Sequence, residues 1–243
     1  MTRPDVVAVC GSRREGSYTR RALRIALDAA SETGARTELR NLRTVDLPPF
    51  DPDAEEGEAV REFKRRVRAA DAVLLGSPVY HGSYSATLKD ALDYCGKDEF
   101  TDTTVGLLAT AGGGSYASTL DHLRVVIRSV HGWTVPTQVG VRNAYDKFDG
   151  AEITELGLED RVRELGREVA ANASVKPSAP PETPAECDVE LDGELGEHVR
   201  DSTERPLYPV SSPANSSDRV RRGGSDRGSG RLPAQAAPRR WSL

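Results

Sequence analysis

The fold of this chain is decided by residues 72–93, which read AVLLGSPVYHGSYSATLKDALD. The apolar run at the start is typical of a buried strand, and Pro78 ends it because proline has no backbone donor for a sheet ladder. A polar loop with Tyr80 and Gly82 then leads into an amphipathic helix that begins near Ser85. The loop therefore lies at the carboxyl end of a strand, where open α/β sheets bind ligands.

The same alternation of strand and helix recurs on both sides of this unit. Strands are predicted at 5–10, 35–42, 72–76, 103–111 and 134–141, and helices at 17–33, 58–70, 85–96, 116–130 and 157–172. Five alternating pairs predict an α/β fold, a flavodoxin-like three-layer doubly wound parallel sheet with five strands in the order 2-1-3-4-5. Pro136 favours an edge position for the last strand.

Composition bounds the class of protein. The chain has 243 residues and a formal net charge of −5, so its charge gives no general case for binding nucleic acid. Its three cysteines, Cys10, Cys95 and Cys187, have no paired spacing, which fits a reducing cytoplasm. Since no apolar run approaches about 18 residues and no signal peptide is recognisable, we expect a cytoplasmic protein without a membrane segment.

The composition also divides the chain. We expect residues 1–175 to form the folded domain. From 176 to 243 Ser, Pro, Gly, Arg and Ala dominate, and apolar clusters are nearly absent. Such a segment cannot bury enough surface to offset its ordering entropy, so a disordered low-complexity tail is predicted there.

Three polar loops follow the first, third and fourth predicted strands. In the order 2-1-3-4-5 the carboxyl ends of these strands neighbour one another at the switch point of the sheet. The topology therefore brings the three loops into one crevice. This convergence predicts a ligand site more strongly than any single loop does.

The first loop, Gly11–Arg20, leads into the helix predicted at 17–33. Amides and the dipole at a helix N-terminus favour an anion, and hydroxyl and guanidinium groups add donors. A phosphate is therefore the predicted ligand, held by Ser12, Arg14, Ser17 and Thr19. The loop has neither a GxGxxG pattern nor the lysine of a P-loop, and the alternative is a polar connection with Ser17 as an N-cap.

The second and third loops offer an apolar wall and a flexible backbone. An x-Pro-x-Tyr turn presents apolar faces and backbone amides, as a flavin ring requires, and glycines permit close backbone approach. The predicted ring contacts are Pro78, Val79, Tyr80, His81, Gly82, Ser83, Gly112, Gly113 and Gly114. The alternatives are an exposed loop aromatic at Tyr80, a surface histidine at 81 and a flexible glycine turn.

Several motifs together resemble the NADPH-dependent FMN reductase family over roughly residues 5–172. They are Gly11-Ser12-x-Arg14-x-x-Ser17, Leu47-Pro48-x-Phe50-x-Pro52-Asp53, Ser77-Pro78-x-Tyr80-His81-Gly82-Ser83 and Leu88-Lys89-x-Ala91-Leu92-Asp93. The resemblance implies noncovalent FMN and a homodimer or homotetramer. It assigns the phosphate to the first loop and the ring to the other two. Val79 stands where many relatives carry glutamate, so any role of that carboxylate is lost here.

The resemblance implies a flavoprotein oxidoreductase that passes hydride from NADPH or NADH to FMN and on to a small acceptor. That acceptor would be a quinone, an azo compound, a free flavin or a metal oxyanion. We expect no catalytic acid–base pair and no metal site, since the four histidines are scattered along the chain. Two alternatives are a flavodoxin-type electron carrier and a protein that binds another ligand in the same crevice.

Overall fold

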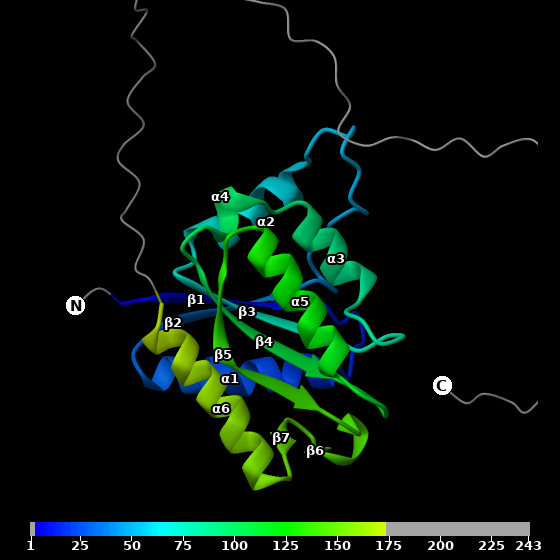
Figure 1. Cartoon of the computed structure of the whole chain (residues 1–243), viewed down its shortest axis with the longest axis vertical. Helices are drawn as coiled ribbons and strands as arrows, with labels where there is room; N and C mark the ends of the chain where they lie inside the picture. Colours follow the sequence, from blue (N-terminus) through cyan, green and yellow to red (C-terminus); the bar gives the residue numbers. More distant parts are fainter. Residues whose placement is uncertain (1–2, 174–243) are drawn as a thin grey trace, which may run out of the picture. The chain divides into compact units, whose positions relative to one another are not determined.

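Five parallel strands form the central sheet in the order β2-β1-β3-β4-β5 (Figure 1). The computed structural model describes residues 3–173, so Cys187 and the predicted tail at 176–243 lie outside the described residues. The strands are β1 (Asp5–Cys10), β2 (Arg36–Asn41), β3 (Ala72–Pro78), β4 (Thr104–Thr110) and β5 (Trp133–Val141). The predicted order is confirmed, and β5, which contains Pro136, is an edge strand as expected.

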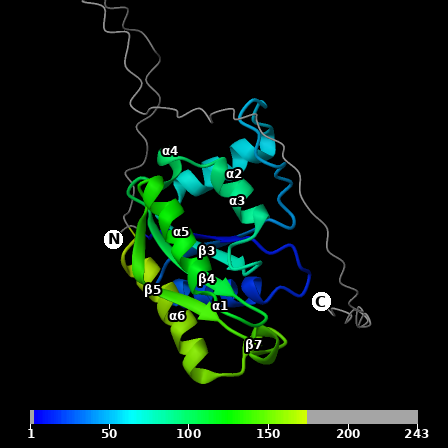
Figure 2. The same cartoon turned by 45° about the vertical axis from the view of Figure 1, so that its right-hand side comes forward.

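Helices cover both faces of this sheet (Figure 2). One face carries α1 (Tyr18–Glu32) and α6 (Leu156–Ala171), and the other carries α2 (Glu58–Ala69), α3 (Ala86–Asp93) and α5 (Ala117–Ser129). This is the three-layer arrangement that alternating strands and helices predict.

Alternation along the strands explains how one sheet supports two cores. In β1, Val6 and Ala8 pack in the cluster with α1 and α6, whereas Val7 and Val9 pack in the opposite cluster. Successive side chains of a strand point to opposite faces, so a strand covered on both sides must be apolar throughout. This is why the central strands are recognisable in the sequence as short apolar runs.

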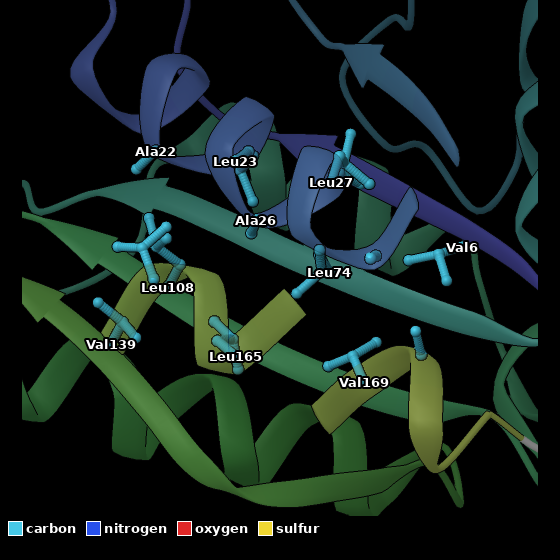
Figure 3. Packing of buried hydrophobic residues seen from close by; sticks show 14 of the residues in the cluster. Val6, Ala22, Leu23, Ala26, Leu27, Leu74, Leu108, Val139, Leu165 and Val169 are labelled. Carbon is cyan, nitrogen blue, oxygen red and sulfur yellow. The ribbon is translucent and has the colours of Figure 1, made fainter. Parts of the chain in front are cut away.

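Helices α1 and α6 approach each other closely on their shared face of the sheet. Figure 3 shows Leu23 and Ala26 of α1 and Leu165 of α6 meeting over Leu74 of β3. At Gly166 of α6, a Cβ atom would lie 1.9 Å from the carbonyl oxygen of Ala26. Any side chain there would force the two helices apart, so glycine sets their spacing.

The helix predicted at 85–96 is wrong at its end, since α3 stops at Asp93 and a short helix, α4 (Lys97–Phe100), follows. The Gly96 amide donates to the Glu99 carboxylate at 2.8 Å, which starts this separate turn. Between β5 and α6 the chain also forms a hairpin that was not predicted, made of β6 (Phe148–Asp149) and β7 (Glu152–Ile153). Strands of two residues are too short to give a periodic pattern.

Candidate functional site

A cavity of about 270 Å³ lies at the carboxyl edge of the sheet. In Figure 2 the arrowheads of β4 and β5 and the blue loop after β1 lie on this same side. The loops after β1, β3, β4 and β5 supply its lining, which consists of Ser12, Arg14, Ser17, Tyr18, Thr19, Pro78, Val79, Tyr80, Thr110, Ala111, Gly112, Ala144 and Tyr145. The three predicted loops therefore converge on one cavity, and a fourth joins them.

Three larger hollows lie at the opposite edge of the described domain, with volumes of about 460, 470 and 550 Å³. Residues at or near the amino ends of the strands line them, such as Asp5 and Arg36 in one and Trp133 in the other two. Ligands of doubly wound sheets bind at the carboxyl ends of strands. We therefore take the smaller cavity as the functional site.

Buried hydroxyls form the floor of this cavity beside the start of α1. Ser12, Ser17 and Thr19 are only 2%, 2% and 1% exposed although they line the cavity. Ser17 is the N-cap of α1, and its Oγ accepts the Arg20 amide at 3.1 Å. The Oγ of Ser12 accepts the Arg14 amide at 3.4 Å. A hydroxyl that accepts such a bond still has its own hydrogen to donate, so the floor can bind an acceptor group.

The charges around this floor favour an anion. Arg14 lines the cavity and forms no ion pair with any described residue. The first turn of α1 contains no acidic side chain, so no carboxylate in that turn opposes the positive end of the helix dipole. Behind the floor, burial raises the pKa of the Cys10 thiol, although hydrogen bonds from the Ser12 backbone and the Ser17 side chain, and then the charges of Arg20 and Arg24, act in the opposite direction. Cys10 is therefore a neutral packing residue rather than a nucleophile.

Hydrogen bonds hold the loops around the cavity together. The hydroxyls of Thr19 in α1 and Thr110 at the end of β4 lie 2.5 Å apart. The Val79 amide donates to the Thr110 carbonyl at 2.8 Å, and the Ala144 amide donates to the Ala111 carbonyl at 2.9 Å. The end of β4 thus fixes the positions of the three neighbouring loops.

A sequence model of the NADPH-dependent FMN reductases matches residues 4–146. The chain belongs to this family. The matched segment includes every residue that lines the cavity. The resemblance and the flavodoxin-like fold inferred from the sequence are confirmed.

Curated relatives of this FMN reductase family member are bacterial proteins. The chain is 40% identical over 112 residues to an FMN-dependent NADPH-azoreductase of Staphylococcus haemolyticus (strain JCSC1435), a match that covers 45% of this chain and 60% of that protein. It is 34% identical over 142 residues to the protein of the same description from Staphylococcus aureus (strain USA300), with coverage of 56% and 76%.

Solved structures support the fold. An oxidoreductase from Corynebacterium diphtheriae superposes with a TM-score of 0.60 at 22% identity, covering 70% of this chain and 97% of the other. The apo form of an NADH:FMN oxidoreductase (EmoB) gives a TM-score of 0.58 at 21% identity, with coverage of 72% and 92%.

The cavity of this family member includes the whole predicted phosphate set. Ser12, Arg14, Ser17 and Thr19 all line it. Ser17 is the N-cap of α1 and Thr19 lies in its first turn. At this end of the helix, the free amides and the helix dipole both stabilise a bound phosphate. The residues present therefore fit the phosphate of FMN.

Of the nine residues predicted to contact the flavin ring, four line the cavity and five do not. Pro78, Val79, Tyr80 and Gly112 line the cavity, whereas His81, Gly82, Ser83, Gly113 and Gly114 do not. Tyr80 and Ser83 exchange backbone hydrogen bonds of 2.9 and 3.0 Å across a two-residue turn, in which φ is +51° at His81 and +78° at Gly82. The Gly82 carbonyl accepts the Ser118 hydroxyl of α5 at 2.6 Å, which ties the turn to that helix. Ring binding by these five residues stays a prediction.

Five residues that line the cavity were not predicted from the sequence: Tyr18, Thr110, Ala111, Ala144 and Tyr145. The last two belong to a short 3-10 turn, η1 (Ala144–Asp146), which follows β5. An aromatic shortly after a predicted strand was the one signal that could have identified this loop. Tyr18 stacks on Phe148 of β6 with ring centroids 5.2 Å apart, so the hairpin supports one wall of the cavity.

Residues 3–173 contain neither a cluster of metal-ligating side chains nor a membrane-spanning helix. No group of three or more His, Cys, Asp or Glu side chains in this part of the chain could hold a metal ion. Within the same range, every helix is too short or too polar to cross a membrane. Of the described histidines, His122 accepts or donates a 3.0 Å bond with the Ser83 hydroxyl, outside the cavity.

Proposed function

We propose that this protein is an FMN-dependent NAD(P)H oxidoreductase, which passes hydride from NADPH or NADH to FMN and on to a quinone, azo compound, flavin or metal oxyanion. The observation that carries the proposal is the buried floor of Ser12, Ser17 and Thr19, with Arg14 beside it, which has no ion-pair partner among residues 3–173. This donor set opens into the same cavity as the apolar wall of Pro78 and its neighbours. An anion at one end and a flat apolar ring at the other describe a flavin mononucleotide.

The residues of the cavity would divide the work of binding. Ser12 and Ser17 would donate to the phosphate while Arg14 neutralises its charge. Pro78 and Val79 would cover part of the ring, and Gly112, which has no side chain, would admit the ring close to the backbone. Hydride chemistry is supplied by the flavin when it is bound, so the chain contributes position and electrostatics.

Val79 provides neither a carboxylate nor a free backbone donor to a ligand in the cavity. Its half-buried side chain lies beside Pro78 on the cavity wall, so this wall has no carboxylate at position 79. Its amide is already bonded to the Thr110 carbonyl, which fixes the wall but leaves that donor unavailable to a ligand. Selectivity at this wall would therefore come from shape and apolar contact.

We also propose that the protein is cytoplasmic and forms a homodimer or homotetramer. Free buried thiols at Cys10 and Cys95 fit a reducing compartment. The assembly is proposed from the resemblance to the FMN reductase family, which implies a homodimer or homotetramer. Sedimentation of the full chain at several concentrations tests the assembly, and a monomer throughout would refute it.

The test of function is an absorbance spectrum of the purified full chain, reconstituted with FMN and then mixed with NADPH without oxygen. Flavin bands that bleach support the reductase. Flavin bands that persist with both NADPH and NADH would instead favour an electron carrier of the flavodoxin type. A protein that retains no FMN after reconstitution would refute the proposed site.

A further inference from the structure

Two tyrosine rings lie at the mouth of the cavity. Tyr80 follows β3 and Tyr145 follows β5, so they come from opposite sides of β4 in the sheet. Both line the cavity, yet Tyr80 is 49% exposed and Tyr145 is 57% exposed. Since the hydroxyl floor is almost fully buried, these half-exposed rings mark the rim where a second molecule would approach.

The backbone at Tyr145 is firmly held although its ring is not. Asn143, two residues before it, has a left-handed backbone with φ of +50°. Ala144 is 2% exposed, and its amide donates to the Ala111 carbonyl of the cavity wall at 2.9 Å. The Asp146 amide closes the turn on the Asn143 carbonyl at 2.9 Å. The ring is therefore presented from a fixed position.

The Tyr145 ring has no aromatic partner in the described part of the chain. The aromatic pairs there are Tyr18 with Phe148 and Phe50 with Tyr94, at centroid distances of 5.2 and 5.1 Å. A large exposed ring, fixed at a cavity mouth and stacked on nothing, is suited to contact a ligand.

We propose that Tyr145 is a specificity-determining residue, whose ring packs with that of Tyr80 against planar aromatic electron acceptors. This inference rests on the proposed function and adds the substrate class that the rim selects. A flat quinone or azo compound has a π-face to offer, whereas ferricyanide, a small inorganic acceptor, does not. Removing the ring should therefore affect the first class and spare the second.

The experiment compares the FMN-loaded full chain with Tyr145→Ala and Tyr145→Phe. Steady-state kcat/KM is measured with NADPH for 1,4-naphthoquinone and for ferricyanide. Affinity for naphthalene-2-sulfonate, which is redox-inert, is measured from its perturbation of the flavin absorbance. Loss of one aromatic contact predicts an about three- to tenfold decrease in kcat/KM for the quinone and in affinity for the sulfonate. Ferricyanide should change less than twofold, and Tyr145→Phe should retain the wild-type values within about twofold.

Trp133→Ala is the matched control. Trp133 is a 71% exposed aromatic at the opposite end of β5, away from the cavity, so its loss should leave the ratio of quinone to ferricyanide activity unchanged. Equal losses with both acceptors, or no loss with the quinone, would overturn the proposal. So would weaker FMN binding or slower bleaching by NADPH in Tyr145→Ala, since the ring would then serve the flavin or the nicotinamide. Failure of the wild type to bind FMN or to oxidise NADPH would instead show that the proposed function is wrong.

Discussion

Replacing Arg14 by alanine tests the phosphate end of the cavity most directly. The guanidinium lines the cavity, has no ion-pair partner among the described residues and lies near the N-terminus of α1. A hydrogen bond to a charged group contributes about 1.5–3 kcal/mol, which corresponds to an about 10- to 150-fold increase in the Kd for FMN. Because Arg14 is exposed to solvent, we expect the lower half of that range.

The assay is a flavin fluorescence titration of the apoprotein with FMN and with riboflavin, which lacks the phosphate. Arg14→Ala should weaken FMN binding while riboflavin affinity changes less than about twofold. Arg13→Ala is the control, since it removes the same charge from an exposed neighbour that does not line the cavity. Unchanged FMN affinity, or an equal loss for riboflavin, would remove Arg14 from the phosphate site. If both variants weakened FMN binding equally, the overall positive charge of the loop would be responsible, and not a direct contact between Arg14 and the phosphate.

Three further predictions concern the fold and its boundary. Ser17→Ala should lower the free energy of unfolding of the apoprotein by about 1 kcal/mol through loss of the α1 N-cap, measured by urea denaturation, and Ser31→Ala, which removes an exposed hydroxyl near the other end of the same helix, should not. Burial raises the pKa of the Cys95 thiol, so above about pH 9 the unfolded chain releases a proton that the native state keeps, and stability falls by up to about 1.4 kcal/mol per pH unit per thiol. Urea titrations at pH 8 and 10 should show a smaller decline in Cys95→Ala, and an identical decline would refute this origin. Deletion of residues 176–243 should leave FMN content unchanged, because the cavity is complete by Tyr145, and loss of flavin on deletion would contradict the predicted domain boundary.

The order of the strands in the sheet could be predicted because strands buried on both faces appear in the sequence as short apolar runs. Strands such as β3 and β4 must be apolar at nearly every position, and the helices between them must be apolar on one side only. Once five such pairs are recognised, few topologies remain. The position of the cavity then follows from the order of the strands.

Other features depend on contacts that no local pattern contains. The division between α3 and α4 depends on the bond from the Gly96 amide to Glu99, which a helical hydrophobic pattern does not reveal. The β6–β7 hairpin is held by Phe148 against Tyr18, 130 positions away in the chain. The wall that contains Tyr145 was missed for the same reason, because its loop has neither a glycine run nor a motif.

In the loop after β3, residues 78–83, the motif predicted the position of the site correctly but not which of its residues line the cavity. His81 and Gly82 both have positive φ, as the central positions of a two-residue type I′ turn require. Their conformational freedom is therefore used to reverse the chain and pair Tyr80 with Ser83, instead of admitting a ligand to the backbone. This reversal holds Tyr80 at the mouth of the cavity, and the bond from Ser118 to the Gly82 carbonyl fixes the turn on α5. Gly82 therefore does not contact the cavity itself. It contributes to the site by allowing the turn that places Tyr80 at the cavity mouth.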